Sequence, residues 1–179
     1  MDFSTQDQAH ASAITDLFQA TFSTSDGSDE GALIGALVAR LRRETPSEDL
    51  RVVSAWDEGA LLGAIIFTRL DFPNDPRKVF LLSPVAVATA HQGRGVGQRL
   101  ITYGLDLLRN EGVDIAVTYG DPAYYGRVGF RAVAEEDLPA PQPLGMPQGW
   151  IAQSLTDAPL TPLKGPSHCV SAFNDPALW

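Results

Sequence analysis

The sequence contains only one cysteine, Cys169, so no internal disulfide can form. A small secreted protein held together by disulfides is therefore excluded, and a lone thiol fits a reducing compartment. We interpret Cys169 as a spare thiol, because His168 is the only basic neighbour that could activate it. Cys-x-x-Cys and His-x-x-x-His pairs are also missing, so we expect no metal site. The sequence lacks a Gly-x-Ser-x-Gly turn as well and does not predict a serine hydrolase.

Basic residues and long apolar runs are scarce too. Lys and Arg number 13 against 22 Asp and Glu, which gives a net charge of −9 at pH 7. This charge opposes binding to nucleic acid or to anionic lipid, and it suits a cationic partner better. An apolar run such as residues 60–67 is far shorter than the roughly 20 residues of a spanning helix, so no membrane association is expected. Residues 1–6 show neither a basic stretch nor an apolar block, so we expect no signal peptide and a cytoplasmic location.

The composition is otherwise that of an ordinary globular protein. Hydrophobic residues make up 44% and charged residues 20% of the chain, which argues against disorder, collagen and coiled coil. A chain of 179 residues suits one domain, and folding at this size buries on the order of 70% of the surface that the unfolded chain exposes. We expect a single domain over residues 1–179, with core motifs at 79–133 and a proline-rich segment at 134–179.

Two helices are predicted before the first clear strand. Apolar residues spaced by three and four form one stripe of a helix over residues 8–22. These residues are Ile14, Leu17, Phe18 and Phe22. A second helix is predicted to begin with Ser28 as its cap and to end before Pro46, after a last turn rich in arginine. Its expected buried side consists of Leu33, Ile34, Leu37, Val38 and Leu41.

The middle of the chain predicts a sheet with one crossover. The expected strands cover residues 50–56, 60–70, 79–87 and 113–118. The first two flank Asp57-Glu58-Gly59 and are predicted to form a hairpin. The third contains Pro84, which lacks the N–H of an interior ladder position, so we expect a bulge or a splay there. A helix predicted over residues 94–110 separates the third strand from the fourth, and this order favours a parallel pair.

The remaining third of the chain is predicted to be mostly loop. Asp121 and Pro122 are a strong start signal for a short helix, which Gly129 is expected to close before a strand near Phe130. Eight prolines fall in the proline-rich segment, where one strand is expected over residues 150–155. We expect this segment to wrap the core or to shape a pocket.

The most informative stretch is His91-Gln92-Gly93-Arg94-Gly95-Val96-Gly97-Gln98, a glycine-rich loop that joins a strand to a helix. Unpaired N–H groups at a helix start attract anions, and glycine lets a phosphate approach the backbone. Arg94 and Arg99 add positive charge. A dinucleotide fingerprint is excluded because Gln98 stands at its third glycine, and a P-loop is excluded because no Gly-Lys pair occurs. A glycine-rich helix start without a ligand is the alternative interpretation.

Two patterns accompany this loop. Gln92-Gly93-Arg94-Gly95-Val96-Gly97 fits the pattern Gln/Arg-x-x-Gly-x-Gly/Ala, and Val85-Ala86-Val87 precedes it on the strand with Pro84. Tyr125-Gly126-Arg127-Val128-Gly129-Phe130 fits the pattern Tyr-x-x-x-Gly-Phe. In this order and separation, the patterns make residues 81–130 resemble the GNAT superfamily of acyl-CoA-dependent N-acetyltransferases. The resemblance implies an α/β (α+β) fold: a mixed, mostly antiparallel central sheet with a splayed parallel strand pair and helices on both faces.

The resemblance also implies an activity. The chain would transfer an acetyl group from acetyl-CoA to a primary amine, which attacks the thioester directly in a ternary complex. Backbone groups of the splayed strand would hold the pantetheine arm, an amide N–H near Val85 or Val87 would stabilise the oxyanion, and Tyr125 would protonate the departing thiolate. The implied cofactor-binding residues are Val85, Ala86, Val87, Gln92, Gly93, Arg94, Gly95, Val96, Gly97 and Gln98. Dimers are common in the family, so a homodimer is an implied assembly.

The sequence departs from the family at several positions. No Asp or Glu lies on residues 79–87, so no general base is assigned and a water relay stays open. His91 is expected to contact cofactor or solvent. Asp121 lies near the place where many members carry an Asn, and we favour a role as helix cap. Tyr125 alone would be interpreted as a packing residue like Tyr124, and the Tyr-x-x-x-Gly-Phe register favours the catalytic role.

Other functions stay open at this point. Because no base is visible, a catalytically silent acyl-CoA-binding or sensing module is the alternative to the enzyme. A purely structural partner protein would bind no CoA at all. The acceptor amine is not identified by the sequence: small amines, aminoglycosides, peptide amino termini and protein lysines all fit, and the acidic balance mildly favours a cationic acceptor.

Overall fold

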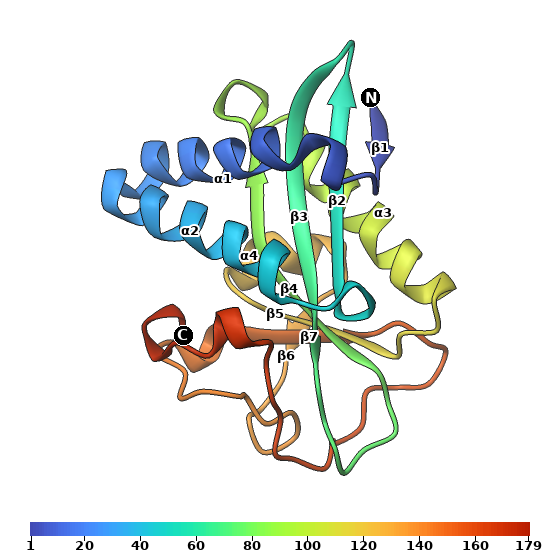
Figure 1. Cartoon of the computed structure of the whole chain (residues 1–179). Helices are drawn as coiled ribbons and strands as arrows, with labels where there is room; N and C mark the ends of the chain where they lie inside the picture. The colour runs from blue at the N-terminus through green and yellow to red at the C-terminus, as the bar shows by residue number, and fades with distance from the viewer. The chain divides into compact units, whose positions relative to one another are not determined.

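The computed structural model describes residues 1–179 and contains seven strands and four α-helices (Figure 1). The elements are β1 (Asp2–Ser4), α1 (Ala11–Asp26), α2 (Ser28–Glu44), β2 (Leu50–Asp57), β3 (Ala60–Leu70), β4 (Val79–Val87), α3 (Val96–Asn110), β5 (Ile115–Tyr119), α4 (Pro122–Tyr125), β6 (Arg131–Ala132) and β7 (Trp150–Ser154). The strand order is β1-β2-β3-β4-β5-β7-β6. The β4–β5 pair is parallel, while β1–β2, β5–β7 and β6–β7 are antiparallel, which confirms the mixed sheet. None of the helices has the length and apolar character needed to cross a bilayer.

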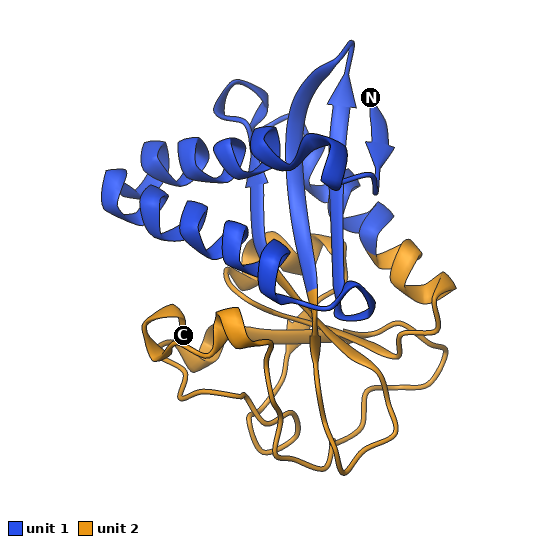
Figure 2. Cartoon of the chain, in the orientation of Figure 1, with its two compact units in different colours: residues 1–67, 84–104 blue, residues 68–83, 105–179 orange.

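The chain divides into two compact units (Figure 2). Unit 1 consists of residues 1–67 and 84–104, and unit 2 of residues 68–83 and 105–179. The divisions fall within β3, β4 and α3, so each of these elements contributes to both units.

In unit 1, α1 and α2 pack against each other, and Gln19 of α1 lies close to Gly31 and Gly35 of α2. Ile14 and Phe18 of α1 are fully buried, as the helical spacing predicts. Two expectations about this pair were wrong. Leu33, expected on the buried side of α2, is 41% exposed. The residue that caps α2 is Gly27, at φ 100°, and Ser28 is already the first helical residue without a side-chain cap bond.

The part of β3 in unit 1 is covered on both faces. Side chains alternate between the faces of a strand, and the four consecutive residues Ala64, Ile65, Ile66 and Phe67 are all fully buried. One face receives α3 at Gly104, where a Cβ would lie 2.5 Å from the ring of Phe67. This close approach leaves room for no side chain at that position of α3.

In unit 2, β5 lies between β4 and β7. Its pairing with β4 ends at Leu82↔Thr118, although β4 continues for five residues, Ser83–Val87, past that pair. The pairing ends two residues before Pro84, the residue at which the sequence predicted a bulge or a splay. The strand expected over residues 113–118 occupies Ile115–Tyr119 instead.

The proline-rich segment crosses the loop between β3 and β4. His168 and Asp71 form a bridge through two backbone hydrogen bonds of 2.8 Å, and the Asn74 side chain donates to the Gly165 carbonyl at 3.0 Å. Within the segment, Trp150 is fully buried and its indole N–H donates to the Leu138 carbonyl at 2.8 Å. The segment thus packs along the loop between β3 and β4 within unit 2.

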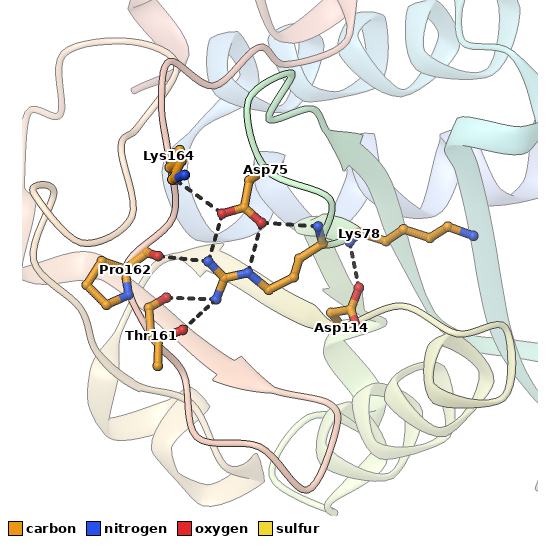
Figure 3. Close-up of polar contacts among 7 residues, drawn as sticks. Asp75, Lys78, Asp114, Thr161, Pro162 and Lys164 are labelled. Atoms are coloured by element: carbon orange, nitrogen blue, oxygen red, sulfur yellow. Dashed lines mark hydrogen bonds and ion pairs between the residues drawn. The ribbon is translucent and has the colours of Figure 1, made fainter.

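A polar network joins the loop between β3 and β4 to the proline-rich segment (Figure 3). The Arg77 guanidinium donates to both carboxylate oxygens of Asp75 at 2.8 and 2.9 Å, and also to oxygens of Thr161 and Pro162 at 2.8 to 3.0 Å. The carboxylate also accepts the Lys164 backbone N–H at 3.2 Å. The Asp75 side chain is only 6% exposed, so its negative charge depends on these donors.

Replacing Arg77 with alanine should lower the free energy of unfolding by about 3 kcal/mol, because the change leaves a buried carboxylate without its main partner. Chemical denaturation measures this as a lower midpoint at unchanged slope. The matched control is Arg40→Ala, which removes an exposed helical ion pair with Glu44 and should change stability by less than about 0.5 kcal/mol. Equal effects of the two variants would contradict the role assigned to this network.

The same network makes stability sensitive to acid. The hydrogen bonds from the Arg77 guanidinium hold the pKa of Asp75 well below its usual range. A carboxylate whose pKa is lower in the folded state stabilises the fold above its unfolded pKa of about 4 and loses this contribution as the pH falls below that value. Unfolding measured from pH 6 to pH 2 should therefore show a steeper loss of stability for the natural chain than for Asp75→Asn. Equal losses of stability with falling pH in the two proteins would exclude Asp75 as the source of the acid sensitivity.

Candidate functional site

The glycine-rich loop joins β4 to α3 in unit 1, where residues 92–95 are exposed. Gly93 and Gly95 adopt φ angles of +73° and +74°, in the left-handed region that other residues rarely occupy. No atom lies within 4 Å of the position that a Cβ would take at either residue. The loop therefore presents bare backbone to open space.

The backbone N–H groups of this loop from Gly93 onward have no hydrogen-bond acceptors within the chain. The first hydrogen bond of α3 runs from the Arg99 N–H to the Gly95 carbonyl at 3.1 Å, so the N–H groups from Gly93 to Gln98 precede the helical ladder. Arg94 and Arg99 are exposed beside them, and no Asp or Glu occurs between residues 79 and 105. This donor set fits a diphosphate, which offers several anionic oxygens to backbone N–H groups at a helix start.

Gln92 has a role inside the protein. Its side-chain amide donates to the Val87 carbonyl at 3.0 Å, and its backbone N–H donates to the Thr89 carbonyl at 3.4 Å. These bonds fix the start of the loop to the end of β4. Of the predicted cofactor-binding residues, Gln92 therefore holds the loop in shape with its side chain.

The backbone of β4 presents alternate residues to its two edges. The Ala88 N–H donates to the Leu62 carbonyl of β3 at 2.8 Å. Because N–H and C=O groups alternate in direction along a strand, those of Val87 and Val85 point away from β3. The Val87 carbonyl already accepts the Gln92 side chain. The end of β4 thus offers the N–H groups of Val85 and Val87 and the Val85 carbonyl to an extended ligand, in the manner of strand addition.

Tyr125 is the last residue of α4 in unit 2, and Asp121 is the residue expected to cap the start of this helix. The Asp121 carboxylate accepts the Ala123 N–H at 2.8 Å, which confirms Asp121 as the helix cap. The Tyr125 ring packs edge-on against Phe130, with centroids 5.8 Å apart, and against Tyr124 at 5.0 Å. Burial of the phenol raises the pKa of Tyr125 to about 12, so this hydroxyl stays protonated at neutral pH.

The structure adds one residue that the sequence did not single out. Gly120 directly follows β5 and lies against Tyr125, because a Cβ at Gly120 would lie 2.7 Å from the ring. No local pattern of the sequence indicates this contact. The ten predicted cofactor-binding residues lie in unit 1 and Tyr125 in unit 2, and no group of three or more His, Cys, Asp and Glu side chains is arranged to hold a metal ion.

Comparisons with known proteins give the family and its ligands. The family model described as the acetyltransferase (GNAT) family matches residues 11–130. The uncharacterized N-acetyltransferase YjhQ of Escherichia coli K12 is 34% identical over 181 residues, which cover 98% of this chain and 96% of that protein. A GNAT family acetyltransferase from Brucella melitensis, solved with acetyl-CoA, has a TM-score of 0.75 at 26% identity and covers 97% of both chains. YhbS of Escherichia coli, solved with CoA, has a TM-score of 0.75 at 28% identity, over 91% of this chain and 88% of that one.

Proposed function

Because this chain belongs to the GNAT family and is an acetyltransferase, we propose that it transfers the acetyl group of acetyl-CoA to a primary amine by direct attack in a ternary complex. One observation carries the proposal. The N–H groups from Gly93 to Gln98 have no acceptors in the chain, and the Cβ positions of Gly93 and Gly95 face open space. Backbone donors of this kind suit the diphosphate of CoA. The acetyl-CoA and CoA complexes of two similar proteins support this choice of donor.

The chain's residues have distinct tasks in binding. Gly93 and Gly95 keep the loop free of side chains, so the diphosphate oxygens reach the N–H groups at the start of α3. Arg94 and Arg99 add positive charge to a protein whose net charge is −9. The unpaired N–H groups of Val85 and Val87 bind the pantetheine arm, and one of them stabilises the oxyanion at the thioester carbonyl.

Tyr125 supplies the proton for the leaving group. As the neutral amine forms the new C–N bond and the C–S bond breaks, the phenol transfers its proton to the sulfur, which leaves as the free thiol. The amine nitrogen loses one proton to water, and Tyr125 recovers one from water, so protons balance over the cycle. No acidic side chain on β4 competes for the role of base, and the amine nitrogen therefore deprotonates through solvent.

The acceptor is a primary amine that we expect to carry positive charge before it reacts. The chain has nine more acidic than basic side chains, so its field attracts cations at low salt. This argument favours small polyamines, aminoglycosides or lysine-rich peptides over neutral acceptors. A rate of association that falls with added salt would agree with it.

The proposal is tested by mixing the protein with acetyl-CoA and a panel of primary amines while the released thiol is measured. At least one amine should accelerate thiol release, and mass spectrometry should find that amine heavier by one acetyl group. A chain that binds acetyl-CoA, with a higher melting temperature as mass action requires, but releases no thiol with any amine would instead be a binding or sensing module.

A further inference from the structure

Gly120 lies between β5 and α4, at a position where a side chain would meet the Tyr125 ring. A Cβ at Gly120 would lie 2.7 Å from Cε2 of that ring, 3.4 Å from Cδ2 and 3.6 Å from Cζ. Cε2 is bonded to Cζ, the carbon that carries the hydroxyl group. The φ angle of Gly120 is not in the left-handed region. The ring, and not the backbone conformation, therefore excludes a side chain at this position.

The backbone of Gly120 is held by Gly149, the residue before β7. The Gly120 N–H donates to the Gly149 carbonyl at 3.0 Å. A Cβ at Gly149 would lie 3.1 Å from the Gly120 carbonyl oxygen, so the two stretches of backbone are in close contact. Gly120 therefore has little freedom to move away from the ring.

The Tyr125 ring is held by its own neighbours. The Tyr125 N–H donates to the Asp121 carbonyl at 3.1 Å, and the Tyr125 carbonyl accepts the Phe130 N–H at 3.2 Å. The ring packs edge-on against Phe130, at an interplanar angle of 77°, and against Tyr124, at 90°. With the backbone fixed in this way, a side chain at Gly120 would have to displace the ring itself.

A displacement of the ring matters because of the hydroxyl that it carries. A general acid transfers its proton over hydrogen-bond distance, so its oxygen must lie close to the receiving atom. An alanine at position 120 would require the ring to move by about 0.7 Å, from 2.7 Å to the 3.4 Å of ordinary contact. A misplacement of about 1 Å can lower a rate about 100-fold. A single methyl group at position 120 is therefore enough to impair proton transfer.

We propose that Gly120 is a positioning residue for Tyr125: because it has no side chain, it admits the phenol ring to the place from which the hydroxyl protonates the leaving sulfur. Gly120 itself gives and takes no proton in the reaction. The proposal rests on the proposed role of Tyr125 as the acid. It adds to that role the requirement that the residue after β5 leaves space for the ring.

The test introduces Gly120→Ala into the natural chain and into the Tyr125→Phe variant. In the natural chain kcat should fall about tenfold, because the hydroxyl is displaced. The Kd of acetyl-CoA should stay within about twofold, since the ring carries the acid and not the groups that bind CoA. In Tyr125→Phe, the alanine should cause no further loss of kcat, because the hydroxyl is already absent.

Gly165→Ala is the matched control for overpacking. Gly165 is also a half-buried glycine of unit 2, and its Cβ would lie 2.9 Å from the Pro139 ring. This variant introduces the same methyl group at a similarly close contact, with no effect on the Tyr125 ring. Its kcat should stay within about twofold of the natural value.

A second readout tests the contact independently of catalysis. Gly120→Ala should lower the melting temperature by about 4 °C, because overpacking against the ring costs stability. In a chain with Tyr125→Ala, which lacks the ring, the same substitution should not lower it. If Gly120→Ala does not fold, Gly149→Ala takes its place, since its Cβ displaces the Gly120 backbone by only a few tenths of an ångström. Its kcat should fall about threefold, and only in a chain that has the Tyr125 hydroxyl.

The outcomes separate this inference from the proposed function. A natural rate in Gly120→Ala, in a protein that needs Tyr125 for turnover, would overturn the inference and leave the function intact. Equal fractional losses of kcat with and without the Tyr125 hydroxyl, or an equal loss in Gly165→Ala, would overturn it too. So would a lower melting temperature that persists in the chain with Tyr125→Ala. Full turnover in Tyr125→Phe would remove the acid itself, and the positioning role of Gly120 with it.

Discussion

Tyr125→Phe should lower kcat about 100-fold and leave the Kd of acetyl-CoA within about twofold of its natural value. The variant removes only the phenolic oxygen, so the ring keeps its contacts with Phe130 and with the space above Gly120. A positioned general acid contributes a factor of about 100 to 10,000 to a rate. Steady-state kinetics and calorimetric titration with acetyl-CoA measure the two quantities separately.

Tyr124→Phe is the matched control for this prediction. Tyr124 carries the same hydroxyl, lies next in the chain and contacts Tyr125 edge-on, and burial raises its pKa as well. We expect its kcat to stay within about twofold. Equal losses in both variants, or none in Tyr125→Phe, would remove Tyr125 as the acid.

The pKa of Tyr125 also predicts the shape of the pH profile. An acid must be protonated to act, and burial raises the pKa of Tyr125 to about 12. The rate should therefore not fall between pH 7 and pH 10, where a larger share of the acceptor amine becomes neutral. A fall within this range would indicate a different acid with a lower pKa.

Gly95→Ala should weaken CoA binding about 100-fold. The backbone at Gly95 has φ +74°, where an alanine costs about 1 to 2 kcal/mol, and the new methyl group would project beside the N–H groups that face the diphosphate. The site has open space, so no atom of the protein is displaced in the free state. Calorimetric titration with CoA measures the loss.

Gly59→Ala separates the loss of binding from backbone strain. Gly59 lies in the turn between β2 and β3, at φ +82° and also with open space at its Cβ position. Both variants should lose similar stability on thermal unfolding, and only Gly95→Ala should lose affinity for CoA. If both lose affinity equally, global strain rather than the loop accounts for the effect.

The sequence predicted those parts of the fold that local chemistry determines. Asp121 before Pro122 makes a helix start that needs no distant partner, and the structure has the expected cap bond. The glycine pattern likewise predicted the loop before α3, because φ angles such as those of Gly93 and Gly95 depend on the absence of a Cβ.

The parts that the sequence did not predict depend on tertiary contacts. Strand β1 has three residues, too few to show a periodic pattern, and exists through its pairing with β2 at Phe3↔Ala55. Leu33 fits the apolar spacing of α2 but is 41% exposed, and spacing alone does not separate it from its buried neighbours. The contact of Gly120 with the Tyr125 ring depends on how the end of β5 meets α4, which no local pattern specifies.

Amide NMR of the protein labelled with nitrogen-15, titrated with CoA, tests directly whether the glycine-rich loop is the diphosphate site. The N–H resonances from Gly93 to Gln98 should show the largest shifts in the spectrum, since these groups exchange water for phosphate oxygens. Pantetheine, which lacks the diphosphate, should leave them nearly unmoved. Saturating CoA binding that shifts other residues while these amides stay in place would show that the diphosphate binds elsewhere.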